Sequence, residues 1–294
     1  ALSTAIEGMN LVPAKYYYVS TTGTDDINHG KGTGTDAFRT IQYAIDDTRV
    51  GTDTIVYVAA GTYSENVTID KSIVLQGNSY TNTTISVSNN QAITITADYV
   101  KVDGFSITHT VANGLEDIGI LLNQADHCTI TNNNISANAI GIELLDSGNN
   151  SISSNILSYN VMGIYFEGTT DGIPGHVHGS GDSEPYYSMS LNNVVNSNTI
   201  SNSQKYYGMY GDAIYLDAAC EDNTFTNNTI TNNQGHGVYA WKADGNTYDG
   251  NTITGNGGPG FELMGSSNNI ITDNPAISNN GYGFLIRSGA LSST

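Results

Sequence analysis

The chain has 294 residues, of which 13% are charged, with 28 Asp and Glu against 9 Lys and Arg. The net charge of −19 excludes the basic stripe of a nucleic-acid-binding surface, and it disfavours a polyanionic ligand. No apolar run approaches the roughly 18 residues of a membrane span. The chain opens at Ala1 without a signal peptide, and we expect a processed protein that is secreted or exposed at the cell surface.

Residues 35–49 have the spacing of a helix. Four apolar side chains share one face of that helix: Phe38, Ile41, Ala44 and Ile45. Either Thr35 or Asp36 can serve as the N-cap, and the sequence does not decide between them. We predict that this helix covers the open end of the strand stack that follows, because an uncovered edge would pair with other chains.

Short β-branched segments with turn residues between them follow the predicted helix. They are TIVYV (54–58), NVTI (66–69), SIVLQG (72–77), TTISV (83–87), AITIT (92–96) and YVKVDGFSIT (99–108). These segments fit the same coil as the later chain, but with a less regular period.

From about residue 117 a repeat begins, in which a small residue precedes alternating apolar residues. The small residues are Gly119, Gly141, Gly163, Ala213, Gly237, Gly260 and Gly283. Their intervals are 22, 22, 50, 24, 23 and 23 residues, so the long one is a coil plus a loop insertion at about 168–192. A period of this length without a helical segment predicts a coil of parallel strands, and it excludes leucine-rich repeats.

Each coil also contains two asparagine positions five residues apart. One column is Asn133, Asn155, Asn198, Asn228, Asn251 and Asn274, and the other is Cys128, Asn150, Asn193, Asn223, Asn246 and Asn269. Equivalent bends stack about 4.8 Å apart. We predict that these asparagines adopt the left-handed conformation and that their amides join one coil to the next.

The opening YYYVSTTGTDDINHGKGTGTDAFRTIQYAIDD, followed by TIVYVAAGTYSENVTI, resembles secreted β-helix proteins of the pectate-lyase-like superfold. The Asn-rich coils resemble the carbohydrate-binding and sugar-hydrolase repeats of that group. The resemblance implies an all-β fold, a right-handed parallel β-helix, with a strand and capping helix in 1–53 and the β-helix in 54–294. The superfold hosts lyases, hydrolases, epimerases, adhesins and structural proteins, and no catalytic motif carries over.

One outward row of the anchor strand contains the candidate ligand-binding residues. Because the first and third residues after the small residue are apolar, the second and fourth must point outward. The second-position row contains Glu143, Tyr165, Tyr215, Tyr239 and Glu262, and beside it lie Glu167, Asp217 and Trp241. Aromatic rings and carboxylates together predict a cleft for a polysaccharide or other glycan; the alternative is a ladder that only stabilises the sheet.

Glu167 and Asp217 are the carboxylate pair that we expect to catalyse glycoside hydrolysis, since stacked coils supply the required separations. A lyase needs a base and a charge neutraliser, for which this region offers few basic residues. The candidate catalytic residues are therefore Glu167, Asp217, His178 and Lys205. The additional substrate contacts are Lys242, His176 and His236. Clustered carboxylates can instead bind Ca²⁺, and a metal site formed by His176 and His178 lacks a clear third ligand.

Three functions remain open: a polysaccharide lyase or hydrolase, a glycan-binding adhesin, and a non-catalytic surface or filament protein. The third would use homotypic assembly through the coil end, because no cap is evident after GFLIRSGALSST. Cys128 and Cys220 are too far apart in the repeat for a disulfide. We expect Cys128 to be a buried thiol and Cys220 to be the better candidate for an intermolecular bond.

Overall fold

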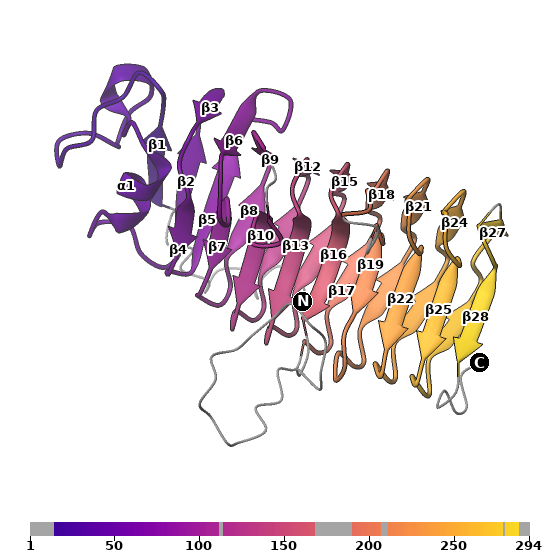
Figure 1. Ribbon diagram of the computed structural model, residues 1–294. Helices are drawn as coiled ribbons and strands as arrows, with labels where there is room; N and C mark the ends of the chain where they lie inside the picture. Colours follow the sequence, from indigo (N-terminus) through magenta and orange to yellow (C-terminus); the bar gives the residue numbers. More distant parts are fainter. Residues whose placement is uncertain (1–14, 112–113, 168–189, 207–210, 279, 288–294) are drawn as a thin grey trace, which may run out of the picture.

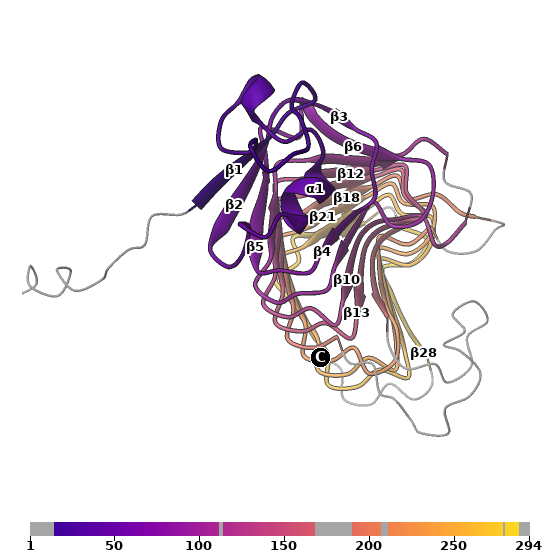
Figure 2. The same ribbon diagram turned by 90° about the vertical axis from the view of Figure 1, so that its left-hand side faces the viewer.

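The computed structural model describes residues 15–111, 114–167, 190–206, 211–278 and 280–287. Three parallel sheets, here called A, B and C, run the length of the molecule. Figure 1 shows their strands side by side along one axis, and Figure 2 shows that successive turns of the chain lie over one another. The architecture is the right-handed parallel β-helix that the sequence predicts.

Each coil contributes one strand to each sheet, in the chain order C, A, B. Sheet A consists of β1 (Lys15–Val19), β2 (Thr54–Val58), β5 (Ile73–Gly77), β8 (Lys101–Asp103), β11 (Thr129–Thr131), β14 (Ser151–Ser153), β17 (Val194–Asn196), β20 (Thr224–Thr226), β23 (Thr247–Asp249) and β26 (Ile270–Thr272). Sheet B consists of β3 (Gly61–Tyr63), β6 (Thr83–Val87), β9 (Ser106–His109), β12 (Asn134–Ser136), β15 (Ile156–Ser158), β18 (Thr199–Ser201), β21 (Thr229–Thr231), β24 (Thr252–Thr254) and β27 (Ala276–Ser278). Sheet C consists of β4 (Val67–Ile69), β7 (Ile93–Ile95), β10 (Ile118–Asn123), β13 (Ile140–Leu145), β16 (Met162–Glu167), β19 (Ile214–Leu216), β22 (Val238–Trp241), β25 (Phe261–Met264) and β28 (Phe284–Arg287).

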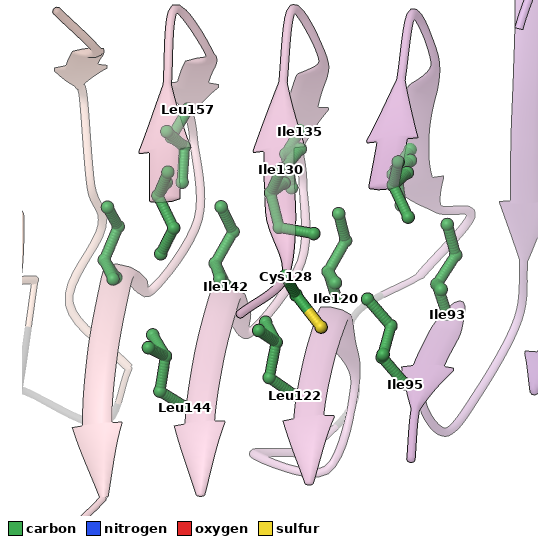
Figure 3. Packing of buried hydrophobic residues seen from close by; sticks show 14 of the residues in the cluster. Ile93, Ile95, Ile120, Leu122, Cys128, Ile130, Ile135, Ile142, Leu144 and Leu157 are labelled. Atoms are coloured by element: carbon green, nitrogen blue, oxygen red, sulfur yellow. The ribbon is translucent and has the colours of Figure 1, made fainter. Parts of the chain in front are cut away.

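Columns of apolar side chains fill the interior of the coil. In sheet C, Ile120 pairs with Ile142 and Ile142 pairs with Ile164, and all three are 0% exposed. Figure 3 shows Ile120 and Ile142 of this column beside Leu122 and Leu144. The alternation predicted from the sequence is therefore confirmed, and each coil buries its apolar residues against those of the next.

Three ladders of buried asparagines join the coils, one more than the sequence analysis identified. In a typical rung, Asn155 Oδ1 accepts hydrogen bonds from the backbone N–H of Asn133 at 3.0 Å and from its Nδ2 at 3.2 Å. Asn155 Nδ2 in turn donates to the carbonyl oxygen of Ile130 at 2.9 Å and to Asn198 Oδ1 at 3.1 Å. The additional column is Asn138, Asn160, Ser203, Asn233, Asn256 and Asn280.

The left-handed backbone conformation that we expected at the ladder asparagines lies one residue earlier. Asn132 and Ser154, which precede Asn133 and Asn155, have φ angles of 54° and 58°. The chain turns the corner at this preceding residue, because the ladder residue must align its own N–H with the next coil. The predicted coil-to-coil bonds are confirmed, and the predicted conformation is wrong.

The N-terminal helix is present but shorter than expected. A 3₁₀ turn covers Gly34–Asp36, and helix α1 covers Ile41–Asp46 with Thr40 as its N-cap. Phe38 cannot be helical, because its N–H and carbonyl oxygen bond the backbone of Tyr18 and Ser20 beside β1. Helix α1 buries its apolar face against the first coils, at the indigo end in Figures 1 and 2.

Candidate functional site

The outer face of sheet C contains the row that the sequence predicts. Glu143 pairs with Tyr165, Tyr165 with Tyr215, Tyr215 with Tyr239, and Tyr239 with Glu262. These five residues occupy five successive strands, from β13 to β25. Because parallel strands lie about 4.8 Å apart, neighbouring side chains of this row are in contact distance.

Most of this row is buried although it lies outside the coil. Glu143, Tyr165 and Glu262 are 3%, 5% and 4% exposed, whereas Tyr215 and Tyr239 are half-buried. A small apolar cluster on this outer face, separate from the interior core, includes Tyr165. It also contains the residues that precede three of the small residues of the repeat: Ile118, Ile140 and Met162. The row therefore has an apolar side around β13 and β16.

Glu143 and Glu167 form a pair of buried carboxyl groups on adjacent strands. Burial is the main cause that raises the pKa of Glu143 well above its ordinary value, followed by its hydrogen bond to Glu167 and the negative charges of Glu167 and Glu116. Two carboxyl groups in contact cannot both ionise easily, so the contact favours the protonated form of Glu143. The Oε2 atom of Glu143 is buried and has no hydrogen-bond partner among the described residues.

Asp217 lies on the next coil and is held by Tyr165. The Tyr165 hydroxyl donates to Asp217 Oδ2 at 3.3 Å, and Asp217 Oδ1 accepts from the N–H of Ala218 at 2.8 Å. Burial, and then the negative charge of Asp217, raise the pKa of Tyr165. The tyrosine is therefore a permanent hydrogen-bond donor that fixes the position of this carboxylate.

The C-terminal half of the row contains an alternating chain of charges. His236 Nδ1 lies 2.7 Å from Asp212 Oδ1, and its Nε2 lies 2.9 Å from Glu262 Oε2. Arg287 Nε lies 2.7 Å from the other oxygen of Glu262. Burial lowers the pKa of His236, but the hydrogen bonds and charges of Asp212 and Glu262 outweigh it, so the pKa is raised. Both cations of this network are thus neutralised by carboxylates.

The accessible part of the row is aromatic. The Tyr215 ring lies 5.4 Å from the Tyr165 ring and 4.9 Å from the Tyr239 ring. Trp241 stands at the edge of this surface, with the Lys242 ammonium 4.6 Å from its ring centre. Aromatic rings with one polar end suit a ligand that has both apolar faces and hydroxyl groups.

The predicted site residues lie in different places. Glu167 shares a hydrogen bond with Glu143, and Asp217 accepts one from the Tyr165 hydroxyl. The pairing of Glu167 with Asp217 stays a prediction. Lys205 is exposed in the turn after β18, where its N–H bonds Gln234 Oε1 at 3.0 Å. Only the last three residues of the insertion are among the described residues. The candidate contacts His176 and His178 lie outside the described residues.

Sequence reasoning missed Asp212 and Arg287 as members of the charged network. Asp212 and His236 each precede a small residue of the repeat, Ala213 and Gly237 respectively. A signal in the sequence could have found Asp212. The residue before the small residue is apolar in the earlier coils and becomes ionisable at Asp212. Arg287 stands in the outward column that follows the row, opposite Met264.

The described residues contain no group of three or more His, Cys, Asp and Glu side chains arranged to hold a metal ion. Both cysteines are free and buried. Cys128 is the buried thiol that we expected, but the intermolecular bond suggested for Cys220 is wrong. Cys220 is 0% exposed, and its Sγ lies 3.4 Å from the carbonyl oxygen of Phe166. Its place near a turn does not expose it, because the side chain points into the coil.

Three solved structures share this fold at low sequence identity. The alginate lyase from Paenibacillus sp. aligns with a TM-score of 0.55 and 14% identity, over 86% of this chain and 96% of that chain. Pectin methylesterase from carrot has a TM-score of 0.57 and 12% identity, over 95% and 82% of the chains. The catalytic domain of an alpha-1,3-glucanase has a TM-score of 0.55 and 13% identity, over 96% and 58%. Identities this low show the fold alone.

A cell surface glycoprotein from Methanothermus fervidus is 37% identical over 98 residues, which are 33% of this chain and 16% of that protein. The chain thus spans only a small part of this relative. None of the helices in the described part of the chain has the length and hydropathy of a membrane span.

A family assignment follows from the repeats. The model of the family described as right handed beta helix region matches residues 118–240 and 176–294. These matches together cover more than half of the chain and contain the strands that form the row on sheet C. The chain belongs to the right handed beta helix family.

Proposed function

We propose that the protein is an extracellular polysaccharide hydrolase that binds its glycan along the outer face of sheet C. The observation that carries this proposal is the pair of buried carboxyl groups, Glu143 and Glu167, in the same row as the half-buried rings of Tyr215 and Tyr239. Rings of this kind bind the C–H faces of sugars, and carboxyl groups supply acid and base chemistry. An extracellular location agrees with the similarity to a cell surface glycoprotein.

Glu143 is the general acid in the proposed reaction, because burial and the contact with Glu167 raise its pKa and favour the protonated form. Asp217 is the second carboxylate, and it follows β19, two strands from Glu143 in sheet C. Two strand spacings and an offset of two residues along the strand place the two positions roughly 12 Å apart, so both side chains must converge to reach the about 6.5–9.5 Å found in inverting hydrolases. Glu143 protonates the glycosidic oxygen while Asp217 accepts a proton from the attacking water, so the product inverts at the anomeric carbon.

Hydrolysis fits this face better than lyase chemistry. A lyase that acts on uronates must neutralise the carboxylate of its substrate. On the described part of this face, His236 and Arg287 are already paired with carboxylates, and Lys242 lies over the ring of Trp241. A uronate would also approach a chain of net charge −19. The proposed substrate is therefore a polysaccharide without acidic sugars.

The test is hydrolysis of a panel of neutral, amino and uronate polysaccharides, followed by NMR of the first-formed anomer. We expect reducing ends from a non-acidic glycan, with inverted configuration, and no unsaturated uronate product. Cleavage restricted to uronates, with absorbance of an unsaturated product, would establish a lyase and refute the proposal. Failure to cleave or bind any member of the panel would also refute it.

A non-catalytic role at the cell surface is the second candidate, because the one curated relative reported above is a cell surface glycoprotein. In this case the coils serve as a scaffold, and assembly of copies through the coil ends is the corresponding proposal. Negative-stain microscopy distinguishes the two: filaments or sheets of the purified protein, together with no glycan cleavage, favour the scaffold. Monodisperse particles that cleave glycan favour the hydrolase.

A further inference from the structure

One carboxyl oxygen of Glu143 has no hydrogen-bond partner among the described residues, although the side chain bonds Glu167. It is 3% exposed, and its Oε2 atom makes no hydrogen bond among the described residues. Leaving a buried polar atom unsatisfied is unfavourable, and few such atoms persist in folded proteins. On an outer sheet face, rather than in the core, the missing partner can be a ligand that donates a hydrogen bond.

The surroundings of Glu143 favour a donor that carries positive charge. Its neighbours on the adjacent strand are Glu167 and Tyr165, and the further negative charge of Glu116 acts on it from the segment before β10. Asp217 adds a carboxylate on the next coil, bonded to Tyr165. The charged groups that act on Glu143 are thus acidic, with the Tyr165 phenol beside them and the apolar Leu121 in register on β10. A cation would gain energy from the carboxylates.

An ammonium group fits this arrangement better than a metal ion. A divalent metal needs several converging ligands, and no described group of three or more His, Cys, Asp and Glu is arranged for one. An ammonium group needs only acceptors for its N–H bonds, and it is attracted to the faces of aromatic rings. The rings of Tyr165 and Tyr215 lie in the same row, 5.4 Å apart.

We propose that the site on sheet C takes a glycan of amino sugars with free amines, whose ammonium group bonds Glu143 Oε2. This inference rests on the proposed function, because it names the substrate class of the same site. The ammonium donates to Oε2, while the proton that Glu143 shares with Glu167 through its other oxygen stays in place for the general acid. The free amine, rather than its N-acetyl derivative, is then the specificity-determining group.

The experiment measures binding of three β-1,4-linked hexasaccharides by calorimetry at about 0.15 M salt, where bulk electrostatics are largely screened beyond 8 Å. The probes contain glucosamine, N-acetylglucosamine or glucose, so they share a backbone and differ at one substituent. All proteins carry Asp217→Asn, which slows hydrolysis of the probes during the titration. They are this parent, called the wild type in this comparison, and the same protein with Glu143→Gln or with the matched change Glu221→Gln. Glu221 lies in the turn after β19 near Asp222 and Asp244, so this control removes the same charge away from the row.

We expect the wild type to bind the glucosamine probe about tenfold more tightly than the N-acetylated one, as for a hydrogen bond between charged groups. E143Q brings the ratio of the two dissociation constants close to one, whereas E221Q retains the wild-type ratio. Thermal unfolding establishes that each variant is folded.

Equal binding of the three probes would overturn the inference and leave the proposed function intact. An equal loss of preference in E143Q and E221Q would also overturn it, because bulk charge would then explain the binding. Displacement of the amine probe by millimolar Ca²⁺ only in the wild type would assign the site to a metal instead. Absence of binding by every probe would refute both the inference and the proposed function.

Discussion

The outer faces of sheets B and C belong to the same coils but differ in chemistry. On sheet B, Thr229 pairs with Thr252, and the side chains are short hydroxyls that reach water. On sheet C, Tyr215 pairs with Tyr239, and carboxyl groups such as Glu143 are buried beside them. The backbone pairing is parallel on both faces, so the difference lies in the outward side chains alone.

This difference indicates where the chain departs from what the fold requires. A hydroxyl in water costs the coil nothing, whereas a buried carboxyl group must be desolvated. Glu143 carries this cost without full hydrogen bonding. Residues that break the local rules of stability are found most often at functional sites, and the predictions below test whether sheet C is such a site.

The largest effect is expected on catalysis. Glu143→Gln and Asp217→Asn each remove a proton donor or acceptor from the proposed reaction, so kcat is expected to fall by about 10²–10⁴. Steady-state kinetics on the hydrolysed glycan measure the change. Thr229→Ala on sheet B serves as the control and is expected to retain wild-type kcat. Equal losses in all three variants would show that the two faces do not differ in function.

A large loss of stability is expected from an asparagine ladder, which supports both faces alike. Asn198 Oδ1 accepts from the N–H of Asn155 at 2.9 Å, and Asn198 Nδ2 donates to Ile152 and to Asn228. Asn198→Ala leaves several buried groups unpaired, at about 1–3 kcal/mol each, and we expect a loss of about 3–5 kcal/mol. Urea denaturation measures it.

A loss below about 1 kcal/mol in this ladder variant would contradict the rung geometry. The matched change is Thr229→Ala, at an exposed position of the neighbouring coil. Surface changes of this kind usually stay within about 0.5 kcal/mol.

The pH dependence of stability is expected to change in E143Q. The pKa of Glu143 is raised above its ordinary value of 4.5, so the folded protein keeps a proton that the unfolded chain loses as the pH rises. The resulting loss of folding stability is therefore absent below the ordinary pKa, and it grows as the pH rises from there toward the pKa of the folded state. E143Q removes this loss and is expected to be more stable than the wild type at pH 8, but not at pH 4.

Urea denaturation at both pH values tests this sign. Asp70→Asn, at an exposed position after β4, is the control for a general charge effect. A wild type that is more stable than E143Q at pH 8 would show that Glu143 is ionised and paired in the folded protein.

The smallest effect concerns the core behind the row. The Tyr248 hydroxyl is buried without a hydrogen-bond partner among the described residues, between the rings of Phe225 and Phe261. Tyr248→Phe removes the unsatisfied group and is expected to stabilise the protein by about 1 kcal/mol. Thermal unfolding would register a higher Tm, and a lower Tm would mean that the hydroxyl has a partner in solution.

The sequence predicted the coil, the interior columns and the row on sheet C, because period and alternation determine all three. The register that joins Glu143, Tyr165 and Tyr215 follows directly from the small residues of the repeat. The helix was predicted too long, because the backbone bonds that hold Phe38 beside β1 join segments far apart in sequence. No local sequence pattern predicts such a long-range hydrogen bond.

The partners within the site could not be predicted from the sequence. The register places Glu167 between the coils of Glu143 and Asp217, and side-chain torsions, which the sequence does not give, bring it to Glu143. The alternation also gives no information on burial, since it shows only that these positions point outward. The charged network escaped notice because Asp212 belongs to a column whose earlier members are apolar.

A crystal structure of Asp217→Asn with a glucosamine hexasaccharide tests the central claim most directly, because slow hydrolysis preserves the bound ligand and Glu143 is intact. The account predicts sugar rings along sheet C, over Tyr215 and Tyr239, with one amine directed at position 143. Sugar bound only to the hydroxyl-rich faces of sheets A or B, or no bound sugar at saturating concentration, would contradict it.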